Sequence, residues 1–288
     1  MTAAGPRRIA RRLLPEDWAV RRVVDLAARL IEGGARLGYA ARAVVYLSVG
    51  AMALLAAFGL TPHATGAVEA LEAWGGWPPG VLLLWTTGLG LYAFAGWRAL
   101  QALFDADRLG ATPAALAERA GKAFSGIVYG GLAVSVFGLL DAIEDLREVD
   151  DQAATQAAIQ AALTRPGGDL LVIVLGVLVV LAGAGNAWRA LSSHFTEALE
   201  CGAGAARWAG GLARVGYLAR GGVLAGAGLL TVSAGLHARA SEADGLGGAL
   251  EALKAQPGGT VWLAMAGLGL VAFAVFGFLK AGLRRIGC

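Results

Sequence analysis

Long apolar runs dominate the pattern of hydrophobic and polar positions along this chain. A helix needs about 20 mostly apolar residues to cross a hydrocarbon core of roughly 30 Å, where lipid offers no hydrogen-bond partner to an open backbone. A soluble helical protein with a large core would show polar stripes at helical spacing inside such runs. Stretches such as LLVIVLGVLVVLAGAG contain none. The pattern therefore predicts an all-α integral membrane protein with six transmembrane helices, approximately at 40–60, 80–100, 123–140, 169–191, 216–236 and 260–280.

The first, third and fifth of these spans begin with related sequences. GYAARAVVYL starts at Gly38, GKAFSGIVYG at Gly121 and GYLARGGVLA at Gly216. The arginine of the first and third copies is replaced by Ser125 in the second. These three helices are therefore expected to play corresponding roles in the fold.

The even-numbered spans and the loops before them repeat as well. PPGVLLLWTTGLGLYAFA matches QPGGTVWLAMAGLGLVAFA, and the middle copy reads RPGGDLLVIVLG. The loop sequences GAVEALEAW, TQAAIQAAL and GALEALKAQ space their apolar residues as short helices do, and the middle helix should be the longest. The repeated unit is thus a span, a short external helix, a Pro-Gly turn and a second span.

Three such units account for most of the chain, at 35–110, 118–199 and 212–288, after a basic N-terminal segment at 1–34. Each unit has an even number of spans, so all three enter the membrane from the same side. We expect parallel two-helix repeats around a pseudo-threefold axis along the membrane normal. Small residues at one equivalent position, Ala43, Gly126 and Gly221, are expected to allow close helix packing.

This order of motifs resembles a family of bacterial membrane proteins of unknown function that has three two-helix repeats. Its marks are a Gly-x-x-Ala-Arg-Gly entrance, a Gly-Ala-Leu loop helix and a Pro-Gly before a Gly-Leu-rich span. The resemblance covers roughly residues 35 to 285, and this chain departs from it at Ala43 and Ser125. The resemblance implies fold and membrane location, and it assigns no catalytic residue.

The N-terminal segment is too long and too charged for a cleaved signal, so it should be retained. Pro15, Glu16 and Asp17 favour a helix start, and apolar residues follow at helical spacing among arginines. This pattern fits a helix lying in the headgroup region. A solvated helix or a basic arm fits it as well.

The basic residues are divided unevenly between the two sides of the predicted membrane. Of the 24 lysines and arginines, 20 lie in the N-terminal segment, the second and fourth loops and the C-terminus. Because positively charged loops stay in the cytoplasm, both termini are predicted to be cytoplasmic, in a bacterial inner membrane. The external loops carry many of the acids, notably DAIEDLREVDD at 141–151. The excess of positive charge is therefore no sign of nucleic-acid binding.

Five basic residues near the predicted cytoplasmic ends of the spans are candidate contacts for lipid headgroups. Their long side chains can snorkel to the interface, and anchoring alone would explain them. A sharper hypothesis is a site for anionic lipid at two cytoplasmic clefts rather than three, since Ser125 leaves one cleft uncharged. No charged residue is expected at mid-depth. The five candidates are Arg42, Arg98, Arg189, Arg220 and Lys280.

Catalytic, metal and cofactor sites have no support in the sequence. The histidines at 63, 194 and 237 lie at span ends or in loops, where they do not form a haem or zinc pattern. The two cysteines lie on the predicted cytoplasmic side, and the glycine runs lack the context of a phosphate loop. No catalytic, cofactor-binding or metal-binding residue is therefore expected.

These observations favour a non-catalytic inner-membrane protein that binds or scaffolds lipids or partner subunits. Anionic lipids, a membrane protein partner or further copies of the chain are the expected partners. The alternative is a channel or transporter for a small solute, favoured by the threefold symmetry and abundant glycine. An enzyme that modifies lipids at the interface is a remote alternative.

Overall fold

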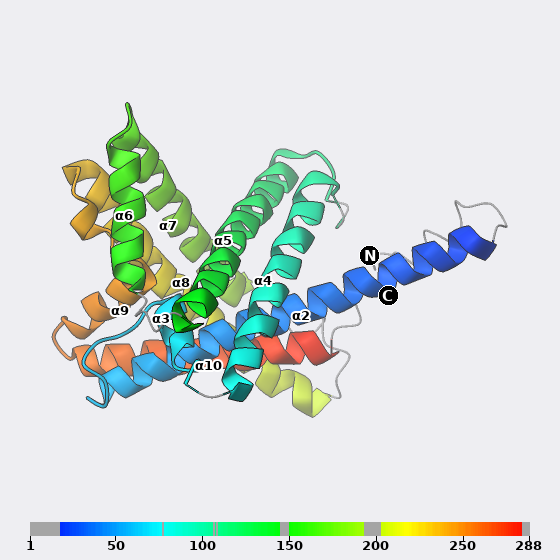
Figure 1. Cartoon of the computed structure of the whole chain (residues 1–288), viewed down its shortest axis with the longest axis horizontal. Coiled ribbons are helices and arrows are strands. Elements are labelled where there is room, and N and C mark those ends of the chain that lie inside the picture. The colour runs from blue at the N-terminus through cyan, green and yellow to red at the C-terminus, as the bar shows by residue number, and fades with distance from the viewer. Residues whose placement is uncertain are drawn as a thin grey trace.

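The computed structural model describes residues 18–76, 78–105, 107, 109–144, 150–192 and 203–283, and the regular secondary structure of these residues is helical (Figure 1). The helices are α2 (Trp18–Ala57), α3 (Ala67–Glu72), α4 (Pro78–Leu103), α5 (Pro113–Glu144), α6 (Asp151–Leu163), α7 (Gly168–Ser192), α8 (Ala203–His237), η1 (Ala240–Glu242), α9 (Gly245–Lys254) and α10 (Gly259–Leu283).

Six of the described helices are long and apolar enough to cross a membrane, and they correspond to the six predicted spans: α2, α4, α5, α7, α8 and α10. The first ends at Ala57, before its predicted end at residue 60. Short helices α3, α6 and α9 lie in the three loops where the sequence predicted them. α6 is the longest of the three, also as predicted, with 13 residues against 6 and 10. The protein is therefore a multi-pass membrane protein in which short helices connect pairs of spans.

The turns that lead from a loop helix into the next span depend on glycine. Gly167 and Gly258 precede α7 and α10 with φ angles of 72° and 71°, a conformation that residues with a Cβ rarely adopt. The next glycine fits tightly against the loop helix, since a Cβ on Gly168 or Gly259 would collide with the carbonyl of Ala162 or Lys254. The Pro-Gly-Gly sequence thus folds each span back against its own loop helix.

The spans associate in pairs that cross from one predicted unit to another. α10 packs along α2, α5 along α4, and α8 along α7, and the hairpins α2–α4 and α8–α10 also pack internally. Figure 1 shows α2 and α10 side by side, while α5 and α7 belong to two arms that diverge. α5 and α7, the two spans of the middle unit, do not form the interface that the other two units have.

Glycines lie where the helix backbones approach most closely. A Cβ on Gly50 would lie 2.9 Å from the carbonyl oxygen of Gly267, and one on Gly228 would lie 2.8 Å from that of Gly176. The predicted small position also packs against a neighbouring helix, as a Cβ on Gly221 would lie 2.8 Å from the carbonyl oxygen of Gly183. Small residues therefore hold these membrane helices together by close contact.

The described part of the N-terminal segment, for which an interfacial helix, a solvated helix and a basic arm were all considered, is continuous with the first span. α2 begins at Trp18 and continues without a break to Ala57, through the expected boundary at residue 34. No proline interrupts it, and Gly33 and Gly34 remain helical. Residues 18–34 therefore extend the first span along its own axis. The expected helix start at Pro15 to Asp17 lies outside the described residues.

Candidate functional site

A cavity of about 1870 Å³ lies among the spans and is lined by residues from all six of them. One end holds basic side chains and is called the basic end below. The other end, the acidic end, is covered by the loops that contain α3, α6 and α9. The charged residues that line the cavity toward its basic end are Arg42, Arg98, Asp107, Glu118, Lys122, Arg189, Arg220 and Lys280.

Arg220, on α8, is bound by side chains from three other spans. Its Nε donates to the Tyr46 hydroxyl at 2.7 Å, and its two Nη groups donate to the Asn186 amide oxygen and to the Tyr129 hydroxyl, the latter at 3.3 Å. Tyr129 also donates to Tyr46 at 3.3 Å. The guanidinium thus links α5 and α7 across the space where these two helices do not pack, and neutral oxygens surround it.

Arg42, on α2, is buried against aromatic rings. Its side chain is 6% exposed, and its guanidinium carbon lies 4.8 Å from the ring centre of Phe273 and 5.4 Å from that of Phe94. The rings of Tyr39 and Tyr129 lie within 6 Å. Each such contact contributes about 0.5–2 kcal/mol. The rings stabilise the cation without neutralising its charge.

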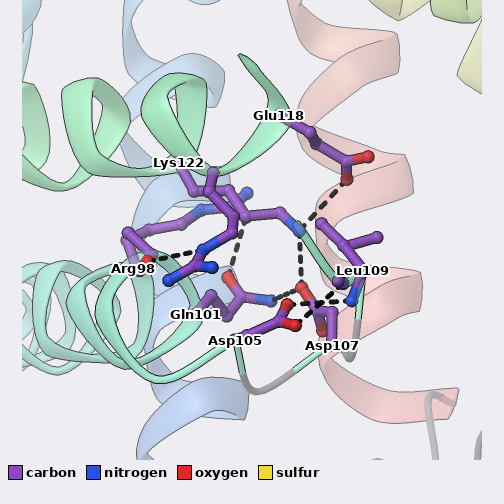
Figure 2. A network of polar contacts seen from close by, with 10 residues as sticks. Arg98, Gln101, Asp105, Asp107, Leu109, Glu118 and Lys122 are labelled. Atoms are coloured by element: carbon purple, nitrogen blue, oxygen red, sulfur yellow. Dashed lines mark hydrogen bonds and ion pairs between the residues drawn. The ribbon is translucent and has the colours of Figure 1, made fainter. Parts of the chain in front are cut away.

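Arg98 and Lys122 belong to a network at the basic end that joins α4 to α5 (Figure 2). Arg98 donates to the Gln101 side-chain oxygen at 2.9 Å, and Gln101 donates to Asp107 at 2.9 Å. Lys122 forms ion pairs with Asp107 at 2.6 Å and with Glu118 at 3.0 Å. These two carboxylates therefore compensate Lys122, while Arg98 has a neutral partner.

Asp105 closes the turn after α4 in the same network. Its carboxylate accepts hydrogen bonds from the backbone N–H groups of Leu109 at 2.8 Å and Gly110 at 2.9 Å (Figure 2). These bonds to Gly110 and Leu109 hold the pKa of Asp105 below its ordinary value, because they stabilise the charged form. The turn thus fixes the position of the α4–α5 network.

Lys280 and Arg189 complete the group of cations in the cavity. The Lys280 ammonium lies 4.8 Å from the ring centre of Phe276 and 3.5 Å from the Tyr217 hydroxyl. Arg189 is exposed and lines the cavity from α7. These side chains enter the cavity from α10 and α7, respectively.

All five predicted headgroup contacts line this one cavity, with the cations contributed by α2, α4, α7, α8 and α10. The expectation of separate clefts is therefore replaced by a single shared space, which Ser125 also lines. Two of the five contacts, Arg42 and Arg220, lie further along their helices than predicted, because the candidate spans begin at Gly33 and Trp208 rather than near residues 40 and 216.

Within the described part of the chain, none of these five cations forms an ion pair with a carboxylate. A membrane-buried arginine costs roughly 2.5–3.5 kcal/mol or more, and hydrogen bonds to a charged group return about 1.5–3 kcal/mol each. Hydroxyls, amides and rings can therefore offset the burial while the positive charge remains. The cationic cavity, defined by Arg42, Arg98, Arg189, Arg220 and Lys280, is suited to an anion.

The acidic end ties the first and last loops together. The Ala64 N–H donates to the Glu251 carboxylate at 3.0 Å, and the Lys254 ammonium donates to the Pro62 carbonyl at 2.7 Å. Gln156, at the middle loop, donates to Asp244 at 2.7 Å. Asp244 and Glu251 also line the cavity. The cavity is therefore positive at one end and bordered by carboxylates at the other.

Ser233, His237 and Glu242 meet at the end of α8, although they do not form a catalytic triad. The Ser233 hydroxyl and the Glu242 carboxylate lie at the same ring nitrogen of His237, Nδ1, at 3.3 and 2.8 Å. A triad places its serine and its acid at opposite ring nitrogens. Ser233 donates directly to Glu242, and this bond, with that to His237, lowers the pKa of Glu242.

The described residues contain no group of three His, Cys, Asp or Glu side chains suited to a metal ion.

The aromatic and amide partners of the arginines were missed by sequence reasoning. Tyr46 and Tyr129 stand eight residues after Gly38 and Gly121, at one position of the repeated sequence, which was the available signal. Phe94 and Phe273 share the Ala-Phe-Ala segment of the even-numbered spans. Recurrence of a tyrosine at one position of two copies could have indicated a buried polar site.

Comparisons with known proteins support the family resemblance and the internal repeat. A family model described as Domain of Unknown Function (DUF1206) matches residues 37–105 and again residues 215–284. The chain is also 26% identical over 260 residues to the uncharacterized protein YxxB of Bacillus subtilis (strain 168), which covers 85% of this chain and 88% of that protein. No solved structure matches the chain. The repeated match corresponds to the first and last hairpins, α2–α4 and α8–α10.

Proposed function

We propose that this protein is a non-catalytic membrane protein that binds an anionic phospholipid, with the lipid phosphate in the cationic cavity. The observation that carries the proposal is the convergence of five cations from five spans on one cavity. A charge pair at 4 Å is worth roughly 4 kcal/mol at an effective dielectric constant of 20. Several cations around one phosphate can therefore exceed the cost of removing it from water.

The chemistry of the lining also favours phosphate over a simple halide ion. Arginine presents several N–H donors in a plane that matches phosphate oxygens, and Arg189 and Arg220 approach the cavity from adjacent helices. The Lys280 ammonium supplies a third, more mobile donor. A phosphate group offers several acceptor oxygens to such a set of cations, whereas a single-atom anion offers one acceptor.

The proposal includes an arrangement of three corresponding units around the cavity. It is supported by the contact of α10 with α2, of α4 with α5 and of α7 with α8, in each of which a unit's second span meets the first span of another unit. The proposed orientation places the basic end and both termini in the cytoplasm of a bacterial inner membrane. Single-cysteine labelling tests the orientation, since a thiol at Asp150 should react from outside in intact cells.

Retention of lipid by variants of the cavity tests the binding proposal. Arg189→Gln and Lys280→Gln each remove one cation of the cavity, the first exposed and the second partly exposed. The matched control is Arg214→Gln, which removes an exposed charge on α8 that does not line the cavity. Native mass spectrometry of protein from phosphatidylglycerol-containing membranes should show lipid lost from the cavity variants and kept by the control. Equal retention in all three proteins would refute the proposal.

Free phosphate must be distinguished from lipid phosphate. The unfolding temperature of the detergent-purified protein should rise with phosphatidylglycerol and change little with the same concentration of inorganic phosphate. A larger rise with inorganic phosphate would show that the cavity serves a soluble anion.

Transport of a small anion is a second candidate, favoured by one observation. The cavity is lined by residues from the basic end, such as Lys122, and by residues from the acidic end, such as Asp150 and Glu251. A cavity with residues of both ends is the geometry that a transport pathway requires. Phosphate uptake by sealed proteoliposomes tests it, and uptake that Arg189→Gln abolishes would favour transport over binding.

A further inference from the structure

We infer that the gap between α5 and α7 is a lateral opening through which an acyl chain of the bound phospholipid leaves the cationic cavity. This inference rests on the proposed lipid binding and adds the route and the residues that form it.

The closed hairpins meet at a glycine that faces a phenylalanine backbone. A Cβ on Gly38 would lie 2.9 Å from the Phe94 Cα, and a Cβ on Gly216 would lie 2.5 Å from the Phe273 Cα. These distances leave no room for any side chain, so the helices touch. Gly121 holds the corresponding place in α5, and a Cβ there would meet nothing within 4 Å. The middle hairpin has the glycine without the contact.

A second pair of small residues closes the same hairpins one turn further along. Gly90 of α4 faces the Cβ of Ala41, and Gly269 of α10 faces the Cβ of Ala219. Ala41 and Ala219 each lie three residues after the first glycine of their unit. Glycine against alanine lets two helix backbones approach closely in lipid.

The middle hairpin has two large residues in these places. Phe124 stands three residues after Gly121, where the other units have alanine. Leu178 stands two residues after Gly176, where the other units have Gly90 and Gly269 after Gly88 and Gly267. A phenylalanine and a leucine cannot occupy the space of an alanine and a glycine, so they keep α5 and α7 apart. Both side chains line the cavity.

The wall of the opening is apolar and continuous with the cationic cavity. Val128, Leu178 and Leu181 line the cavity, and they are 49%, 39% and 60% exposed. α5 and α7 are the least buried of the six spans, with 28% and 22% of their most apolar stretches buried, against 33% in α8, 39% in α4 and 67% in α2. The Tyr129 hydroxyl and Asn186, which bind Arg220, come from the same two helices. The opening thus joins cations on the inside to an apolar surface on the outside.

A phospholipid is the occupant that matches both parts. Its phosphate complements the cations and its chain complements the exposed valine and leucines, so each part reaches a surface of its own polarity. An apolar protein helix would cover the opening and leave the cations without a counter-charge. A second copy of this chain would place apolar surface of α5 and α7 against the opening, because the carboxylates Glu118, Asp141 and Asp169 lie within two turns of the ends of these helices.

Restoring the small residues of the closed hairpins tests the inference. In Phe124→Ala with Leu178→Gly, α5 and α7 should approach each other, and long-chain phosphatidylglycerol should bind about tenfold more weakly, a change of about 1.4 kcal/mol. The matched control is Val134→Ala with Leu170→Ala, which trims two exposed side chains on the same helices outside the cavity. Spin labels at Ile127 and Leu175, with the native cysteines replaced, measure the α5–α7 distance in phosphatidylcholine–phosphatidylglycerol nanodiscs.

Dihexanoyl phosphatidic acid separates the chain route from the headgroup site, because it reaches the protein from water. The variant Phe124→Ala with Leu178→Gly should bind dihexanoyl phosphatidic acid with the affinity of the wild type. A shorter α5–α7 distance with unchanged phosphatidylglycerol binding would overturn the route while leaving the headgroup site intact. An unchanged distance would overturn the role of Phe124 and Leu178. A label-to-label signal between chains that carry one label each at Ile127 would assign the opening to a second copy instead. Arg189→Gln with wild-type affinity for both lipids would reject the headgroup site itself.

Discussion

The hairpins α2–α4 and α8–α10 close, whereas the hairpin α5–α7, with related sequence, stays open. The closed hairpins place Gly38 and Gly216 against the backbones of Phe94 and Phe273, while Gly121 faces empty space. The difference shows that a glycine allows close approach without causing it. The neighbouring positions decide the outcome, because Phe124 and Leu178 stand where the closed hairpins have an alanine and a glycine.

The largest expected effect comes from adding one methyl group at the equivalent glycines. Gly216→Ala would place a Cβ 2.5 Å from the Phe273 Cα, a backbone atom that cannot move aside. We expect a loss of about 1–3 kcal/mol or more of stability. Gly121→Ala should be neutral or stabilising by up to about 1 kcal/mol, since alanine favours helix and nothing obstructs it. Detergent unfolding curves of both variants measure the contrast, and similar losses would contradict the open middle hairpin.

The two tyrosines of the Arg220 network offer a graded test between the first and middle units. Tyr46→Phe removes an acceptor that lies 2.7 Å from the Arg220 Nε and should cost about 1–3 kcal/mol. Tyr129→Phe removes two longer bonds of 3.3 Å and should cost about 0.5 kcal/mol. Both variants keep the aromatic ring, so the same unfolding assay isolates the hydroxyl. A larger loss for Tyr129→Phe would reverse our ranking of the contacts.

Lys122 of the middle hairpin stands where the closed hairpins have Tyr39 and Tyr217. Its side chain is 8% exposed, and its partners Asp107 and Glu118 are partly exposed at 33% and 45%. Lys122→Met should therefore cost about 1 kcal/mol, less than breaking a fully buried pair. High salt should lower the free energy of unfolding of the wild type toward that of Lys122→Met. If the difference between the two proteins does not change with salt, the lysine acts through packing.

The smallest effect is expected in acid, at the loop after α8. Hydrogen bonds from Ser233 and His237 lower the pKa of Glu242 from its ordinary value of 4.5. A lowered pKa stabilises the folded state above about pH 4.5, and this contribution is lost as the pH falls through the lower folded value. In Glu242→Gln, the free energy of unfolding should fall less steeply below about pH 4.5 than in the wild type, as unfolding curves measured at several pH values would show. The same fall in both proteins would exclude Glu242 as its source.

The elements of this fold were largely predictable, since they depend on local sequence. Apolar length identifies the six spans, and Pro-Gly turns with short amphipathic segments identify α3, α6 and α9. The continuity of α2 across residue 34 was missed, because hydropathy marks where the apolar span begins and does not mark where the helix begins. The opening between α5 and α7 was missed because it depends on the sizes of Phe124 and Leu178, residues 54 positions apart in the chain.

The candidate site was predicted in composition and not in arrangement. Arg42 and Arg220 were selected from a repeated motif, yet their depth depends on where each helix begins, which hydropathy places only to within a few residues. Their meeting in one cavity depends on how the helices pack. Tyr46 and Phe273 gain their role from that packing, because an aromatic ring in a span looks the same in sequence whether it faces lipid or a guanidinium.

The pairing of α2 with α10 has a consequence for how the protein is made. Gly50 of the first span completes its contact with Gly267 of the last span, so most of the chain must be synthesised before that interface can form. Until α10 is present, the face of α2 that carries Arg42 remains unpacked and is exposed to lipid or to a chaperone. Chains that stop before α10 lack the α2–α10 interface. We therefore expect them to be degraded faster than the full chain, so that correct assembly depends on the last span.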